Sequence, residues 1–129
     1  MTNDNEPDTE LPESLPRPDP MAAILPIVGR KWHPVIVHRL LVNGPQGFND
    51  LNRSIEGISP KVLSNCLDDL QDKGILNRRI VSEKPVRIQY ALTERGESLE
   101  SVITAMERWA NDRITRTNSR DEAVVSVPR

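Results

Sequence analysis

The stretch from Phe48 to Gly74 reads FNDLNRSIEGISPKVLSNCLDDLQDKG and contains two amphipathic segments with a glycine between them. The first, which ends at Ile55, has apolar residues at 48, 51 and 55, the spacing of one face of a helix. The second begins with Ser59-Pro60, typical of a helix N-terminus, and ends before a glycine, typical of a helix C-terminus. Two short helices joined by a glycine-containing turn of about three residues predict a helix-turn-helix.

A further helix is predicted on the N-terminal side, from Trp32 to Asn43. Its sequence, WHPVIVHRLLVN, carries apolar residues around a broad face, as in a helix buried at the centre of a domain. Its proline lies in the first turn, where it is tolerated, and Gly44-Pro45 ends the helix. An earlier apolar segment, 21–28, contains Pro26, which is expected to kink or shorten a helix there.

Downstream of Gly74 the apolar period changes from about 3.6 residues to 2. Segments 75–81 and 86–92 therefore predict two strands, and the polar segment 82–85 between them is the turn of a hairpin. Thr93 is expected to cap a long final helix. The apolar stripe of that helix comprises Leu99, Val102, Ile103, Met106, Trp109 and Ala110. This order of elements predicts an α+β, mainly α fold: a winged helix-turn-helix domain with N-terminal and long C-terminal dimerisation helices.

Length and composition are those of one small domain. The chain has 129 residues and one cysteine, which excludes an internal disulfide framework and a multi-cysteine zinc site. The longest apolar stretch is far shorter than the ~20 residues of a membrane span, and the acidic, proline-rich N-terminus lacks the basic start of a signal peptide. We therefore expect a cytoplasmic protein. The predicted organisation is a disordered acidic tail over 1–18, a winged helix-turn-helix domain over 19–114 and a flexible tail over 115–129.

Charge is distributed unevenly along the chain. The formal net charge is −2, yet residues 30–96 hold eleven Lys and Arg against seven Asp and Glu, a difference of +4. Because binding responds to the local electrostatic field, the acidic total does not argue against a polyanionic partner.

Four runs of the sequence resemble one family. These are GRKW (29–32), LLVNGPQGFNDL (40–51), GISPKVLSNCLDDLQDKGIL (57–76) and PVRIQYALTERG (85–96), followed by Trp109. Together they resemble the HxlR-type winged-helix transcriptional regulators, and the resemblance covers roughly residues 19–112. It implies a homodimer that binds a pseudo-palindromic operator in double-stranded DNA. It also implies that the helix at 59–73 lies in the major groove, with the hairpin as the wing.

The sequence departs from the family pattern at several positions. Asp19 stands where the family often has a redox-reactive cysteine before a proline, so that thiol sensor is missing. Gly47 stands where Arg or Lys usually precedes the phenylalanine of the second helix. Cys66 and Asp68 stand where the recognition helix often carries basic residues, which argues against strong phosphate anchoring by that helix.

Candidate DNA-binding residues lie on two elements. In the helix at 59–73 the side chains nearest the N-terminal end of the outer face are Ser59, Lys61, Ser64 and Asn65. Asparagine can bind adenine through two hydrogen bonds, and Ser or Lys can reach bases or phosphates. The hairpin supplies Arg78, Arg79, Lys84 and Arg87, which could follow the phosphate backbone or enter a minor groove. Arg30 and Lys31, at the start of the central helix, are weaker phosphate candidates, and for every one of these residues the alternative is a solvated surface.

Other reactive residue types have simpler explanations. Cys66 borders the buried face and is expected to pack as a small hydrophobe. His33 and His38 are five positions apart, which is the wrong spacing for two ligands of one metal on a helix. The carboxylates at 68, 69 and 72 are interpreted as solvated charge, and no nucleophile–base motif or phosphate-binding loop occurs. We therefore expect no enzyme, no cofactor and no metal.

The sequence thus favours a DNA-binding transcriptional regulator that acts as a dimer. One winged module is too small to cover the apolar stripe of the final helix, so Leu99, Val102, Met106 and Trp109 are expected to be exposed. Ile103 lies in the same stripe, and these five residues form the predicted dimer interface. The segment 22–28 is expected to need a partner as well. The alternative is a winged helix used for protein–protein assembly, and the sequence leaves open whether a small-molecule effector binds.

Overall fold

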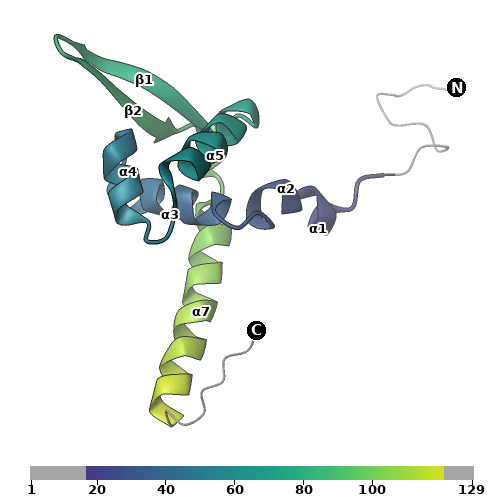
Figure 1. Ribbon diagram of the computed structural model, residues 1–129. Helices are drawn as coiled ribbons and strands as arrows, with labels where there is room; N and C mark the ends of the chain where they lie inside the picture. The colour runs from purple at the N-terminus through teal and green to yellow at the C-terminus, as the bar shows by residue number, and fades with distance from the viewer. Residues whose placement is uncertain (1–16, 121–129) are drawn as a thin grey trace, which may run out of the picture.

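The computed structural model describes residues 17–120, so most of the predicted N-terminal tail and residues 121–129 lie outside the described residues. The chain order is α1 (Pro20–Ala23), α2 (Leu25–Val28), α3 (His33–Asn43), α4 (Phe48–Ser54), α5 (Pro60–Asp72), β1 (Leu76–Glu83), β2 (Val86–Leu92), α6 (Glu94–Glu97) and α7 (Glu100–Arg120). Figure 1 shows a central body from which the β1–β2 hairpin, the α1–α2 arm and α7 project in three directions. The predicted winged helix-turn-helix is confirmed. No helix in the described part of the chain is both long and apolar enough to cross a membrane.

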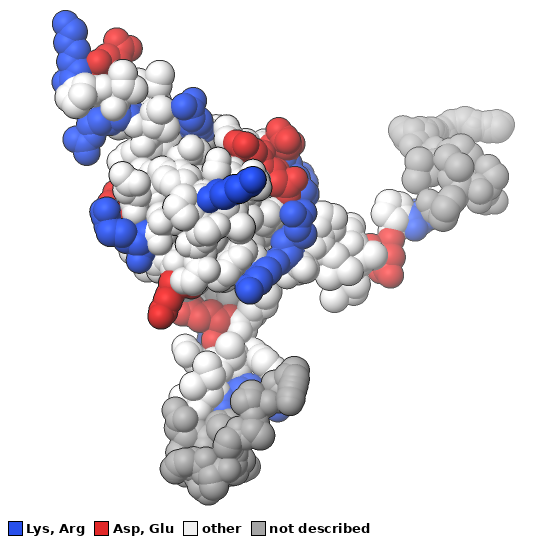
Figure 2. All heavy atoms as spheres, viewed as in Figure 1, with Lys and Arg blue, Asp and Glu red and all other residues white. Residues whose placement is uncertain are grey.

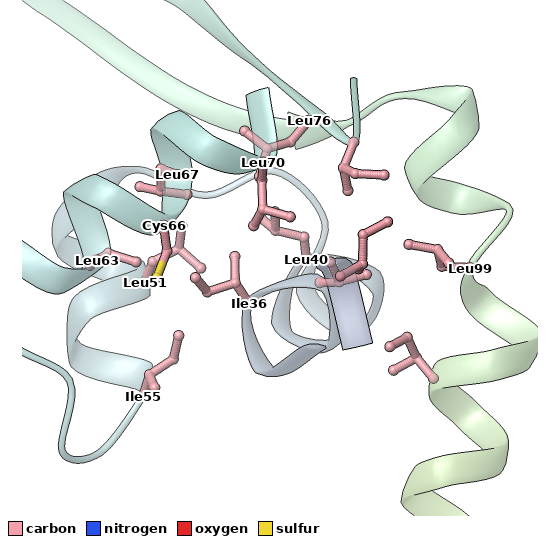
Figure 3. Packing of buried hydrophobic residues seen from close by; sticks show 14 of the residues in the cluster. Ile36, Leu40, Leu51, Ile55, Leu63, Cys66, Leu67, Leu70, Leu76 and Leu99 are labelled. Carbon is pink, nitrogen blue, oxygen red and sulfur yellow. The ribbon is translucent and has the colours of Figure 1, made fainter. Parts of the chain in front are cut away.

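The core lies around α3, as its broad apolar face predicts. Ile36, Val37 and Leu40 of this helix are buried and pack in one cluster with side chains from α4 and α5. Figure 3 shows Leu63 of α5 and Leu51 of α4 on the same side of this cluster, next to Ile36. Because this core fixes α5 against α3 and α4, the opposite face of α5 is left for solvent or a ligand.

The helix-turn-helix has the ends that the sequence predicts. The Ser59 hydroxyl accepts a hydrogen bond of 3.1 Å from the backbone N–H of Val62, and Pro60 occupies the first turn of α5. Gly74 follows α5 with a φ of 75°, a conformation that favours glycine. Local capping chemistry therefore determines where α5 begins and ends.

The hairpin is longer and less regular than predicted. Its strands are antiparallel, with Leu76 opposite Leu92, and β1 continues to Glu83, so the turn is shorter than the predicted 82–85. The register shifts between Ile80 and Ser82. A feature that the sequence did not predict is the pairing of Gln46 with Tyr90 through two backbone hydrogen bonds of 3.0 and 2.8 Å. This pairing attaches the base of the wing to the segment between α3 and α4.

The predicted long final helix is present as α7, but it does not begin at the Thr93 cap as expected. The Thr93 hydroxyl does cap a helix, accepting from the N–H of Gly96 at 3.0 Å, but that helix is the short α6. The chain passes so close to the wing that a Cβ on Gly96 would lie 2.2 Å from the carbonyl oxygen of Ile75. The Ser98 hydroxyl donates to the Arg95 carbonyl, and α7 starts afresh two residues later. It then continues through Arg120, past the start at 115 expected for the tail.

The N-terminal apolar segment is interrupted as Pro26 predicts. Helix α1 stops at Ala23, and α2 starts at Leu25 with the proline in its first turn, where no N–H is needed. The Asp19 carboxylate accepts a hydrogen bond from the N–H of Met21 and so caps α1. The result is a short arm beside the body.

Candidate nucleic-acid interface

The outer face of α5 carries the predicted recognition residues. Lys61, Ser64 and Asn65 are exposed, as is Ser59 at the helix start. The opposite face holds the buried Leu63, Cys66, Leu67 and Leu70. Since the Ser59 oxygen already caps the helix, its remaining hydroxyl hydrogen is the group that could donate to a ligand. The four residues therefore form one polar surface at the N-terminal half of α5, which we call the α5 face.

Asp69 holds α5 in place. One of its carboxylate oxygens, Oδ2, lies 2.7 Å from Nε2 of the fully buried His33 and is hydrogen-bonded to Nζ of Lys73. The Arg30 guanidinium is 3.5 Å from the same oxygen. The interpretation of Asp69 as solvated charge is therefore wrong. This carboxylate joins the N-terminus of α3 to the C-terminal half of α5, and we call the four residues the Asp69 cluster.

Electrostatics define the protonation states in the Asp69 cluster. The hydrogen bonds from Lys73 and His33 lower the pKa of Asp69 to about 2, so the carboxylate is ionised at neutral pH. Burial lowers the pKa of His33, although the Asp69 hydrogen bond opposes that effect. An ionised carboxylate can only accept, so Nε2 of His33 carries the proton and donates it. No signal in the sequence pairs these residues, because they are 36 positions apart.

The four wing cations are all exposed but lie on different faces of the hairpin. Arg78 is opposite Tyr90, on the face that also carries Leu76 and Leu92. Arg79 is opposite Gln89 on the other face. Lys84 lies at the turn, and Arg87 lies at the outer end of β2, opposite Ser82. Figure 2 shows basic side chains along the projecting wing.

Arg79 lies on the hairpin face that is turned toward acidic residues of the C-terminal helices. It lines a hollow between the wing base and the C-terminal helices together with Glu97 and Glu100. The hollow therefore combines the Arg79 side chain with two carboxylates, whereas Arg78 lies on the opposite face of the strand.

Lys31 packs against its neighbour in the chain. Its ammonium lies 5.0 Å from the centroid of the Trp32 ring, a cation–π distance, and its side chain is exposed. Trp32 in turn lies next to the turn before α5, since a Cβ on Gly57 would meet its ring at 3.7 Å. Lys31 is therefore held near the helix-turn-helix but apart from the α5 face.

The predicted dimer residues divide into two groups. Leu99 and Ile103 are only 9% and 3% exposed and pack in the core of the chain itself, so the expected exposure of Leu99 is wrong. Figure 3 shows Leu99 on the side of the core next to Leu40. Val102 is half-buried, whereas Met106 and Trp109 are 41% and 64% exposed. Exposed apolar residues at the two ends of the domain also include Met21, Leu25 and Ile114, of which Leu25 lies in the segment 22–28 that was expected to need a partner.

Cys66 and the histidines behave as their positions predict. The thiol is buried, and that burial raises its pKa, which disfavours a reactive thiolate. His38 lies between the Arg39 side chain and Glu107, whose carboxylate is 3.3 Å from its Nε2. The residues that the structure describes bring no three His, Cys, Asp or Glu side chains together as a metal site.

Comparison with known proteins defines the family. The model of the HxlR-like helix-turn-helix family matches residues 27–118. The chain belongs to the HxlR-like helix-turn-helix family. Among its HxlR-like relatives is the HTH-type transcriptional regulator YodB of Bacillus subtilis, 34% identical over 91 residues that cover 70% of this chain and 80% of YodB. Another is the HTH-type transcriptional regulator YvaP of the same organism, 35% identical over 86 residues, 67% of this chain and 79% of YvaP.

Solved structures agree with this HxlR-like assignment. The redox regulator HypR in its reduced form superposes with a TM-score of 0.70 at 27% identity, covering 78% of this chain and 99% of HypR. The family match over residues 27–118 spans the helix-turn-helix, the wing and most of α7. The α5 face and the wing therefore lie within the region that defines the family.

Proposed function

We propose that this chain is a sequence-specific DNA-binding transcriptional regulator that acts as a homodimer on a pseudo-palindromic operator and carries out no catalysis. The observation that carries the proposal is the α5 face: four exposed polar residues on a helix that the Asp69 cluster holds against α3, beside a cationic wing. Membership in a family whose relatives are named transcriptional regulators supports the same conclusion.

Base recognition is assigned to the α5 face. Asn65 can donate to and accept from one adenine, and Ser64 and Lys61 can reach neighbouring bases or phosphates. The helix as a whole is weakly charged, because Lys61 and Lys73 are offset by Asp68, Asp69 and Asp72. Recognition by α5 therefore depends on hydrogen-bond geometry more than on charge.

Dimerisation is assigned to exposed apolar side chains at both ends of the domain. Met106 and Trp109 lie on α7, and Met21 and Leu25 lie on the α1–α2 arm. Such apolar area marks an interface, and a two-fold dimer places two copies of α5 at a fixed separation. Half-sites centred about one helical turn, or ~34 Å, apart are then expected.

Selection from a pool of random duplexes tests the function. The wild-type protein should enrich an inverted repeat, and Asn65→Ala should lose about 1–3 kcal/mol on that sequence while binding random DNA nearly as before. Asn111→Ala is the matched control, since it makes the same change at an exposed asparagine of α7, outside the α5 face. Failure to enrich any sequence would instead support the protein-assembly alternative.

The oligomeric state is tested separately by light scattering. Met106→Glu places a charge in the proposed interface and should give a monomer. Asn111→Glu adds the same charge at an exposed polar position of α7 and should leave the dimer intact. A Met106→Glu protein that remains dimeric would overturn the assignment of this surface.

A further inference from the structure

The wing carries apolar side chains that its own fold does not cover. Ile80 of β1 is 59% exposed and Val86 of β2 is 63% exposed, whereas each buried hydrophobic residue of the core is at most 9% exposed. Both lie on the hairpin face that begins with the buried Leu76 and continues outward through Tyr90 and Ile88. The apolar face therefore extends outward along the wing, the hairpin that projects from the body in Figure 1.

Hairpin stability accounts for only part of this pattern. Ile80 faces Ile88 directly across the strands, a pair that helps hold the hairpin together. Val86, by contrast, faces Glu83, a charged residue with which it forms no apolar pair. A β-branched residue at such a position favours the strand conformation, but threonine would do so without leaving apolar area in water.

The surroundings of this apolar face are cationic. Arg78 shares the face, Lys84 lies at the turn next to Val86, and Arg87 follows it on β2, whereas Glu83 is the one acidic residue of the hairpin. A second copy of the same wing would bring these cations against one another. An anionic partner with an apolar surface between its charges fits better, and duplex DNA, whose minor groove is walled by deoxyribose between two rows of phosphates, is such a partner.

The dimensions agree with this partner. Strand β1 has eight residues and spans about 26 Å at the usual rise per residue. The centre of a major groove and that of the next minor groove are separated by about half a helical turn, or ~17 Å. With α5 in the major groove, the outer part of the wing can therefore reach the adjacent minor groove.

We propose that Ile80 and Val86 form an apolar wedge that enters the minor groove next to the α5 site and bends the duplex. This inference rests on the proposed DNA-binding function and adds to it a contact that does not depend on charge. Apolar side chains inserted at a minor groove typically unstack a base step and kink DNA by about 20–90°. Specificity then arises in part from how easily the operator deforms.

The test uses the full-length protein and a duplex that it has selected, labelled at both ends for energy transfer. Wild-type protein should shorten the end-to-end distance. The double variant Ile80→Thr/Val86→Thr keeps β-branched residues in both strands, and it should leave the duplex nearly straight and bind it on the order of tenfold more weakly. Its salt dependence should match that of the wild type, because no charge has changed.

Two control variants separate the wedge from folding and from electrostatics. Ile80→Val/Val86→Ile keeps both side chains apolar and should bend the duplex as the wild type does. Lys84→Ala should reduce the salt slope by up to about 0.9 while leaving the bend unchanged. Circular dichroism of each variant checks that the hairpin remains folded.

The outcomes distinguish this inference from the proposed function. If the wild-type protein binds its selected duplex but the threonine variant bends it equally, DNA binding stands and the wedge is refuted. If wild-type protein without DNA forms assemblies larger than a dimer, and the threonine variant does not, the apolar face belongs to a protein contact and the wedge is equally refuted. If no duplex is bound at all, the proposed function fails and the wedge fails with it.

Discussion

Replacing Asp69 by asparagine should destabilise the protein by about 1–2 kcal/mol at pH 7. The carboxylate is the shared acceptor of the Asp69 cluster, bonded to His33 and Lys73 and close to Arg30. Asparagine nearly preserves the shape of the side chain and can still accept from His33. It removes the negative charge, however, and leaves Lys73 next to a neutral amide.

The magnitude follows from the pKa of Asp69, which is about 2 in the folded protein against an ordinary value of 3.8. Each unit of pKa difference between the folded and unfolded states corresponds to about 1.4 kcal/mol, so the full difference would be worth about 2.4 kcal/mol. Roughly a third of the side chain remains exposed, and solvent weakens the interaction, which lowers the expected loss to about 1–2 kcal/mol.

The pH dependence has a definite sign. Because folding lowers the pKa of Asp69, its stabilising contribution is complete above the unfolded value near 3.8 and is lost as the pH falls toward 2. The difference between the wild type and Asp69→Asn should therefore be constant from pH 7 to about pH 5 and shrink below pH 4.

Urea unfolding followed by circular dichroism, at one protein concentration and a series of pH values, measures this difference. Asp68→Asn is the matched control, because Asp68 is the exposed neighbour on the same helix, and it should change the free energy of unfolding by less than about 0.5 kcal/mol. The reasoning is refuted if Asp69→Asn is as stable as this control at pH 7, or if the difference persists unchanged at the lowest pH.

Three further predictions concern packing and charge. Gly96→Ala should lower the free energy of unfolding in urea by about 1–3 kcal/mol, because a Cβ would lie 2.2 Å from the Ile75 carbonyl oxygen. A variant as stable as the wild type would contradict the close approach of α6 to the wing. Leu99→Ala should lower the free energy of unfolding by about 2–5 kcal/mol, because Leu99 is buried in the core of its own chain; a loss below 1 kcal/mol would contradict this placement. Arg78→Ala should reduce the slope of log affinity against log salt by up to about 0.9. Arg79→Ala should reduce the slope by less, because the Arg79 side chain lines a hollow with two acidic residues. Equal reductions would show that the two hairpin faces contact DNA alike.

Much of the fold could be predicted because its signals are local. The helix-turn-helix boundaries depend on a hydroxyl cap at Ser59, a proline at the first helical position and a glycine with positive φ at 74. The outer face of α5 follows from its 3.6-residue period, which separates exposed Asn65 from buried Leu63. In each case the physical cause acts within a few residues along the chain, so a single sequence is enough to predict the feature.

What the sequence could not provide depends on contacts between distant segments. Apolar spacing places Leu99 and Met106 on one helical stripe, but the stripe does not show where α7 leaves the body, and so Leu99 is buried while Met106 is exposed. The interpretation of Asp69 failed for the same reason, since its partner His33 comes from another helix. The predicted strand already places Arg78 and Arg79 on opposite faces, but only the structure shows that the Arg79 side chain lines a hollow with Glu97 and Glu100.

The positions of the charges give α5 and the wing separate roles in the proposed complex. At the C-terminal end of α5, the Lys73 ammonium forms an ion pair with Asp69. Lys61 is therefore the basic residue of this helix that we expect to contact a phosphate. On the wing, Arg78, Lys84 and Arg87 are exposed, and Glu83 is the one acidic residue of the hairpin, although Asp50 of α4 shares a hollow with Arg87. Phosphate neutralisation should therefore come mainly from the wing, while α5 discriminates between bases at small electrostatic gain. Substitutions of these wing cations should accordingly weaken binding to all duplexes alike, whereas substitutions of Ser64 and Asn65 should alter mainly the preference among them.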